Sequence, residues 1–152
     1  QQIRVGNSML HAIDGKTERT FTVPCGDLLA EGVAYLPAIK SEFVAIKSGD
    51  GGVVADMDAL DPYSVGVTAP EGLSGEQLIE MVKESAAKGT MINLTFHGIG
   101  GDYLTVSSQA HGELLEYLAA NRNIYWTDTF INIMKYVKSA RPEPTTSEIK
   151  TE

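Results

Sequence analysis

His97 is the residue whose type and position in this chain best suit chemistry. It follows an uncharged, mostly apolar run over residues 91–96 and precedes a glycine-rich turn over residues 98–101. An uncharged run between two glycines predicts a strand buried on both faces of a parallel sheet. Imidazole exchanges a proton near neutral pH, and strand ends in α/β folds face the ligand cleft. His97 is therefore a candidate catalytic residue; the alternative is a histidine that hydrogen-bonds a loop carbonyl at the strand end.

The other potential metal ligands do not form a recognised binding pattern. Cys25 is the only cysteine, so it cannot form an internal disulfide, and no cysteine or histidine lies at zinc-ligand spacing from it. The three histidines include no pair four residues apart. Asp56, Asp58 and Asp61 are better explained by a solvated acidic loop than by a carboxylate site. We therefore expect no metal ligand set in this chain by itself.

Composition narrows the class of protein without naming a function. A chain of 152 residues, of which 43% are hydrophobic, is long enough for one domain, expected over residues 1–138 and followed by a flexible polar tail over residues 139–152. Twenty acidic against twelve basic residues give a net charge of -8, which argues against a nucleic-acid partner. The apolar stretches are too short to span a membrane, so we expect a soluble protein.

Helical and strand patterns alternate along the chain. Helices are predicted over residues 3–13, from a Ser74–Gln77 capping box to about residue 88, and over residues 108–120 and 129–137. Strands are predicted over residues 20–23, 43–46, 64–68, 91–96 and 124–126, with a long loop over residues 48–62 and Trp126 in the core. Strands separated by helices indicate an α/β fold built from parallel βα units.

Four short segments, taken in order, resemble the second half of polysaccharide deacetylases of the NodB-homology type. The resemblance runs over residues 2–137, and the segments are Thr20-Phe21-Thr22-Val23-Pro24-Cys25-Gly26-Asp27, Glu42-Phe43-Val44-Ala45, Leu94-Thr95-Phe96-His97-Gly98-Ile99-Gly100 and Tyr125-Trp126-Thr127-Asp128-Thr129-Phe130. The resemblance implies the C-terminal part of a distorted (β/α) barrel. It also implies a hydrolase that uses a divalent metal, zinc or a similar ion, to remove acetyl groups from N-acetylated carbohydrate.

The same resemblance implies roles for particular residues. His97 would be the acid that protonates the leaving amine. The turn formed by Pro24, Cys25, Gly26 and Asp27 would bind substrate, with the backbone N–H of Cys25 facing the developing oxyanion. Thr95 would lie beside the acetyl methyl group, at a position where the family usually has leucine.

Two family motifs are missing from the chain. Neither the aspartates that supply a base and a metal ligand nor the paired histidine ligands are present. The expected partners are thus an N-acetylated glycan and either the missing N-terminal half or further copies of the chain, joined through exposed strand edges. The resemblance suggests a secreted or cell-surface location. The alternative is a non-catalytic carbohydrate-binding or interaction module on the same fold.

Overall fold

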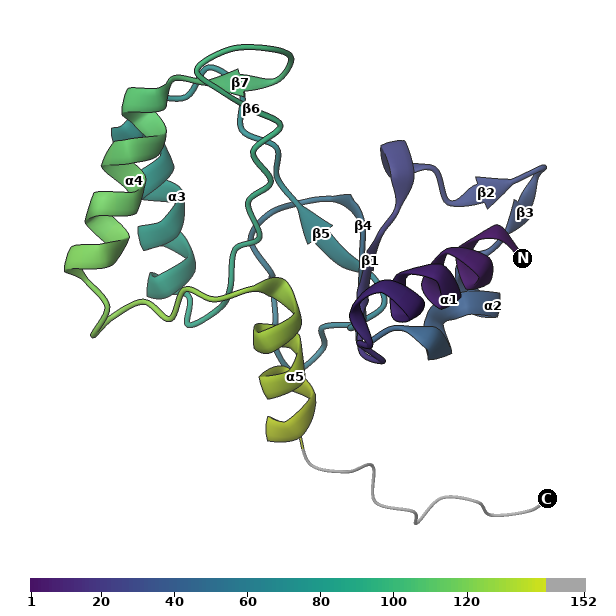
Figure 1. Ribbon diagram of the computed structural model, residues 1–152. Helices are drawn as coiled ribbons and strands as arrows, with labels where there is room; N and C mark the ends of the chain where they lie inside the picture. Colours follow the sequence, from purple (N-terminus) through teal and green to yellow (C-terminus); the bar gives the residue numbers. More distant parts are fainter. Residues whose placement is uncertain (142–152) are drawn as a thin grey trace.

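A computed structural model describes residues 1–141 (Figure 1) and shows an α/β arrangement of helices and parallel strands. In chain order the elements are α1 (Gln2–Asp14), β1 (Thr20–Thr22), the 3₁₀ turn η1 (Pro24–Gly26), β2 (Leu29–Ala30), β3 (Val33–Ala34), α2 (Leu36–Ile39), the 3₁₀ turn η2 (Lys40–Glu42), β4 (Ala45–Asp50), β5 (Val65–Val67), α3 (Gly75–Ala87), β6 (Gly98–Ile99), β7 (Thr105–Val106), α4 (Ser108–Ala120) and α5 (Phe130–Ala140).

The main sheet has the order β1-β4-β5, and both pairings are parallel. A further parallel bridge joins Thr68, just after β5, to Leu94. The strands β1, β4 and β5 and the segment around Leu94 are therefore parallel neighbours. Their carboxyl ends lie at the same edge of the sheet. The predicted parallel βα units are confirmed to this extent. The strand predicted at residues 43–46 lies later, at Ala45–Asp50, and takes up the first residues of the predicted loop.

Residues 91–96 do not form the buried strand predicted from their composition. Only Ile92 and Leu94 make isolated bridges, and the segment is half-buried. Its backbone bonds join Asn93 and Thr95 to Thr68 and to the loop at Gly52. In an extended segment the backbone groups of successive residues point to opposite edges. The bonds of Asn93 and Thr95 therefore all lie on one edge of the segment, and no strand within residues 1–141 lies along its other edge. An apolar run needs partners on both edges to become a central strand.

The predicted strand at residues 124–126 is also wrong. The backbone amides of Ile124 and Tyr125 both donate to the carbonyl of Asn121, which extends the end of α4 into a turn. The Tyr125 hydroxyl lies 3.0 Å from that of Tyr117. Trp126, predicted to be core, is 54% exposed.

The predicted helices are largely confirmed, because local residues determine their ends. Gly15 ends α1 in a left-handed conformation, with φ of 67°. Ser74 and Gln77 form both hydrogen bonds of the capping box that begins α3. Helix α4 has its predicted bounds, and α5 continues to Ala140, two residues beyond the predicted domain boundary. The rest of the predicted tail, residues 142–152, lies outside the described residues.

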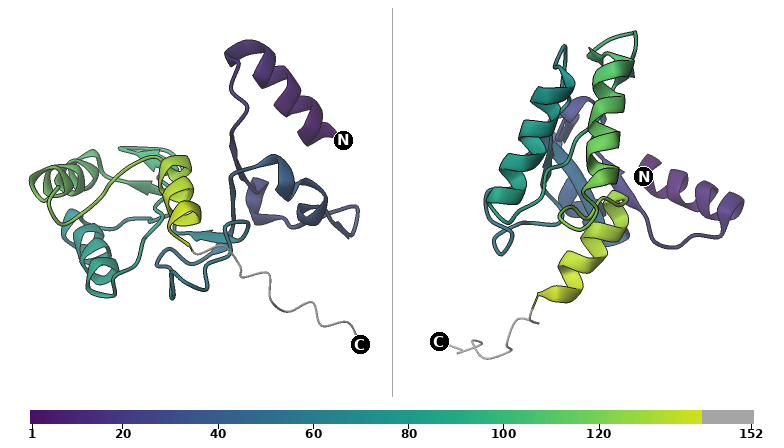
Figure 2. Two further views of the ribbon diagram at one scale, coloured as in Figure 1. Left: turned by 90° about the horizontal axis from the view of Figure 1, so that it is seen from below. Right: turned by 90° about the vertical axis from the view of Figure 1, so that its left-hand side faces the viewer.

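Three apolar clusters stabilise the fold. One joins β4 to the β1 and α2 region, one packs α5 on β4 and β5, and one packs α3 against α4. Helix α1 contributes no buried residue and projects from the rest of the molecule (Figure 2). It is held by Arg4, which pairs with Glu42 and donates to the carbonyl of Ala38 at 2.9 Å, and by Ile3, which packs against the first cluster. The apolar face of α1 is therefore largely open, with Ile13 81% exposed.

Candidate functional site

The carboxyl edge of the sheet carries the residues that the sequence singled out. The turn η1 follows β1 at this edge, and His97 follows the bridged residue Leu94. Figure 1 shows the turn after β1 and the β6/β7 pair toward the same end of the sheet. Ligand sites of parallel sheets lie at this edge, because the loops that follow the strands converge there.

The turn after β1 is closely tied to its neighbours. The Val23 amide donates to the Lys47 carbonyl at 2.9 Å, and the Asp27 amide donates to the Pro24 carbonyl at 3.0 Å. The Tyr35 hydroxyl donates to the Asp27 carbonyl at 2.9 Å. Burial, and then the nearby Asp27 carboxylate, raise the pKa of Tyr35, so its hydroxyl remains a donor. These bonds fix the path of the turn while Pro24, Cys25, Gly26 and Asp27 stay exposed.

Cys25 adopts an uncommon backbone conformation in this turn. Its φ of 53° places it in the left-handed region, which costs a non-glycine residue roughly 1–2 kcal/mol. Gly26 follows at φ of 72°, where glycine carries no such cost. Within residues 1–141 the Cys25 amide has no hydrogen-bond acceptor. An exposed, unpaired N–H in a fixed turn can donate to an anionic oxygen.

His97 is exposed and sits at the start of a second tight turn. Its ring meets Tyr103 edge to face, with ring centroids 5.4 Å apart and the planes at 89°. The next residue, Gly98, is buried and pairs with Thr105. A Cβ on Gly98 would lie 2.3 Å from the Gly101 carbonyl oxygen, so only glycine fits there without a shift of the backbone. The glycine after His97 thus closes a turn that fixes the backbone of the histidine.

Thr95 is half-buried just before this turn. Its amide donates to the Thr68 carbonyl at 2.9 Å, which ties the segment before His97 to the end of β5. Thr95 and His97 are therefore both held at the carboxyl edge of the sheet, beside the end of β5.

The two turns do not contact each other. No hydrogen bond or ring contact within residues 1–141 joins His97 to residues 24–27. Two strands, β4 and β5, lie between β1 and the 91–95 segment, and three inter-strand steps amount to about 14 Å. The structure thus places the predicted residues on one edge but leaves a gap between them.

The remaining histidines and aspartates belong to local structure. The His11 ring nitrogen Nδ1 lies 3.1 Å from the Lys16 carbonyl. The His111 ring meets Phe96 edge to face at 4.7 Å. Asp56 and Asp61 accept backbone amides two residues ahead, as turn-forming aspartates do. No group of three or more His, Cys, Asp or Glu side chains in residues 1–141 is arranged to hold a metal ion.

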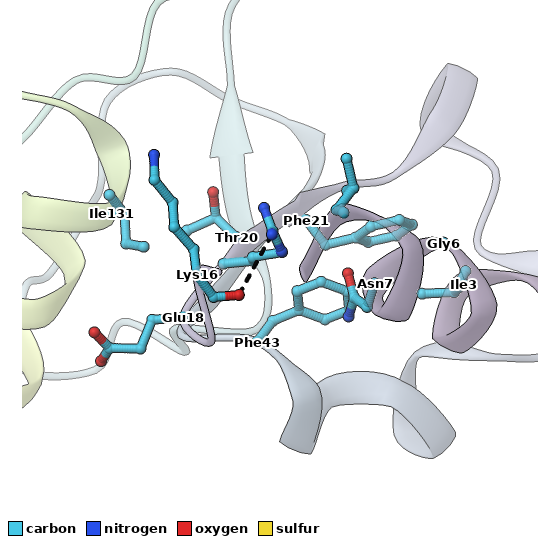
Figure 3. A pocket seen from close by; sticks show the side chains of 11 residues that line it. Ile3, Gly6, Asn7, Lys16, Glu18, Thr20, Phe21, Phe43 and Ile131 are labelled. Atoms are coloured by element: carbon cyan, nitrogen blue, oxygen red, sulfur yellow. Dashed lines mark hydrogen bonds between the residues drawn. The ribbon is translucent and has the colours of Figure 1, made fainter. Parts of the chain in front are cut away.

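Neither of two cavities in the described part of the chain is lined by Thr95, His97 or the turn at residues 24–27. One, of about 470 Å³, lies between α1 and the amino end of β1, and Figure 3 shows Lys16, Glu18 and Phe21 among its lining. The other, of about 680 Å³, lies where α3 and α4 begin and includes Ser74 and Gly100. The capping serines could have indicated this second cavity, because helices that follow parallel strands begin at the carboxyl edge.

No helix in the described part of the chain combines the length and apolar character needed to cross a membrane. In comparisons with protein-family models, with curated proteins and with solved structures, the chain gave no significant match.

Proposed function

We propose that this chain forms the C-terminal part of a metal-dependent deacetylase that acts on N-acetylated carbohydrate, of the polysaccharide deacetylase type. The observation that supports the proposal is the parallel order β1-β4-β5 with the added bridge to Leu94. This order brings the Pro24 turn and His97 to one edge, as the resemblance implies for a distorted (β/α) barrel. The expected substrate is a polysaccharide or a peptidoglycan-like glycan.

The residues of the two turns supply two of the four functions that amide hydrolysis requires. Hydrolysis needs a base for the attacking water, a group that polarises the carbonyl, a donor to the oxyanion and an acid for the leaving amine. The unpaired Cys25 amide is suited to the oxyanion. The exposed imidazole of His97 is suited to protonate the amine nitrogen. Thr95 would contact the acetyl methyl group, and the cysteine thiol has no role.

The resemblance also implies a divalent metal, and the described residues do not fit one. Three suitable side chains are not gathered anywhere in residues 1–141. The metal ligands, and the base for water, would come from residues other than 1–141.

The gap between the two turns supports a second candidate function. An acid and an oxyanion donor must reach the same acetamide group, whereas the strand ends that carry them are about 14 Å apart. An open sheet with this spacing suits a non-catalytic carbohydrate-binding or interaction module. The deacetylase proposal requires that additional chain curve the sheet and bring the two turns toward a common centre.

Replacement of His97 in the polypeptide encoded by the whole reading frame tests the proposal. Because a positioned general acid contributes about 10²–10⁴-fold in rate, His97→Ala should lower kcat on an N-acetylated oligosaccharide by that factor and leave metal content unchanged. Cys25→Ala should have little effect, since only its backbone is used. His11→Ala, at an exposed histidine on α1, is the matched control.

Two results would contradict the assignment. Loss of metal in His97→Ala would make the residue a ligand. Full activity in His97→Ala would make it a strand-end histidine with no chemical role.

A further inference from the structure

Trp126 and Tyr136 form an exposed aromatic pair that the fold does not require. Trp126 lies in the loop between α4 and α5, and Tyr136 lies on α5. Their ring centroids are 5.1 Å apart with the planes at 86°, an edge-to-face arrangement. The two residues remain 54% and 59% exposed. The core-facing side of α5 uses Met134 and Val137 instead, so the aromatic pair lies on the helix face that the core does not use.

Two polar side chains beside the pair are held in place by hydrogen bonds. The Asp128 carboxylate accepts the Asn132 side-chain amide at 2.8 Å and the Thr129 backbone amide at 2.6 Å. These two bonds lower the pKa of Asp128, and the Trp126 side chain adds a smaller lowering as a further donor. Asn132 and Tyr136 are four residues apart and share one face of α5. The indole is thus oriented by its edge-to-face contact with Tyr136, although it is only partly buried.

This combination of groups fits a sugar ring better than a protein surface. A pyranose presents C–H groups on its face and hydroxyls on its rim. The C–H groups pack on the electron-rich face of an aromatic ring, and carboxylate and amide groups bind the hydroxyls. A protein partner would favour an apolar core without a carboxylate in it. The net charge of -8 and the ionised Asp128 argue against an acidic glycan.

We propose that Trp126 and Tyr136, with Asp128 and Asn132 beside them, bind a ring of a neutral glycan at a site separate from the Pro24 and His97 turns. Only the choice of an N-acetylated glycan rests on the proposed deacetylase function. The site would hold one sugar ring of the polymer on the outer face of α5.

Fluorescence titration of the chain tests the site directly, because Trp126 is the only tryptophan. The probe is a tetramer of β-1,4-linked N-acetylglucosamine, and the glucose tetramer tests whether the acetamido group matters. We expect a saturable change in tryptophan emission. Loss of one aromatic contact in Tyr136→Ala should raise Kd by about 2- to 10-fold, and Tyr136→Phe should retain most of the affinity.

Matched variants and the remaining outcomes complete the test. Leu29→Ala removes a residue that is equally exposed, at 54%, on the β2/β3 hairpin and should leave Kd unchanged. Trp126→Ala, measured by calorimetry, should abolish the binding heat. An absent fluorescence response, a Kd unaffected by Tyr136→Ala, or an emission change that follows protein concentration without sugar would overturn the proposal. The last result would show that a second copy covers the patch.

Failure of this site can be distinguished from failure of the proposed function. The titration measures binding and does not depend on deacetylase activity, whereas the His97 experiment measures turnover. Binding without turnover would retain the site and remove the deacetylase proposal. Turnover without a tryptophan response would do the reverse.

Discussion

Alanine at Gly98 should destabilise the protein, whereas alanine at Gly101 in the same turn should not. A Cβ on Gly98 would lie 2.3 Å from the Gly101 carbonyl oxygen and 3.2 Å from that of Tyr103, both backbone atoms that cannot rotate away. A Cβ on Gly101 would meet nothing within 4 Å. Neither glycine has a positive φ, so alanine is not excluded by the backbone conformation of either.

The difference between the two variants isolates the effect of the clash. Both substitutions reduce the entropy of the unfolded chain, which favours the folded state by about 0.4–1 kcal/mol, and this gain cancels in the comparison. Overpacking in a tight site typically costs about 1–3 kcal/mol. Gly98→Ala should therefore be less stable than Gly101→Ala by about 1–3 kcal/mol in the free energy of unfolding.

Urea unfolding followed by circular dichroism measures this difference, provided that the slopes of the two transitions agree. The chemical shift of the His97 ring, followed by NMR, should move in Gly98→Ala and stay in place in Gly101→Ala. Equal stabilities would show that the turn after His97 is not closely packed. Gly98 would then have no part in fixing the backbone of His97.

Three further predictions concern the rest of the molecule. Ser74→Ala removes one bond of the capping box of α3 and should cost about 1 kcal/mol in unfolding free energy; a cost below about 0.3 kcal/mol would contradict the role of the cap. The pKa of Asp14 is lowered chiefly by its hydrogen bond from Arg19, so its stabilising effect should be present above its unfolded pKa of about 3.9 and disappear as pH falls through the folded value; Asp14→Asn should flatten that part of the acid stability profile, and an unchanged profile would argue against the pair. The chain should associate in solution, because the outer edge of β1 and the outer edge of the 91–95 segment have no strand partner among the described residues; a monodisperse monomer in light scattering, with a sharp melt, would favour a self-contained smaller fold.

Local signals in the sequence predicted the helices well and the strands at β1 and β5, whereas two of the five strand predictions were wrong. The end of α1 at Gly15 and the start of α3 at Ser74 depend on residues within one turn of the chain, so the sequence contains the needed information. The strand predictions at residues 91–96 and 124–126 depended on neighbours elsewhere in the chain. Residues 91–96 bond along one edge only, and the amides of Ile124 and Tyr125 bond to Asn121 instead. Apolar, β-branched composition cannot show whether such partners exist.

The candidate site, too, could be predicted from the sequence only where local residues determine it. The tight turns at Pro24 and at His97 could be predicted because proline and glycine mark them directly. The β1-β4-β5 order between them could not, since each step of the sheet is set by packing between distant segments. The aromatic pair was missed because Trp126 was expected to be core. The adjacent Tyr125 takes that place instead, packing near the α3–α4 cluster, and leaves Trp126 exposed.

Whether further strands pair with the two outer edges of the sheet decides between the two proposed functions. Backbone groups of Arg19 and Val23 bond to β4, so by strand alternation those of Thr20 and Thr22 face outward from the sheet. The 91–95 segment has its own unpaired edge on the opposite side. Strands added at both edges can close the sheet around a common axis, and closure turns the loops at the carboxyl edge toward that axis. If additional chain closes the sheet, the Pro24 and His97 turns can act on one acetamide group. If the sheet stays open, the gap of about 14 Å persists and binding is the only function that the two turns can share.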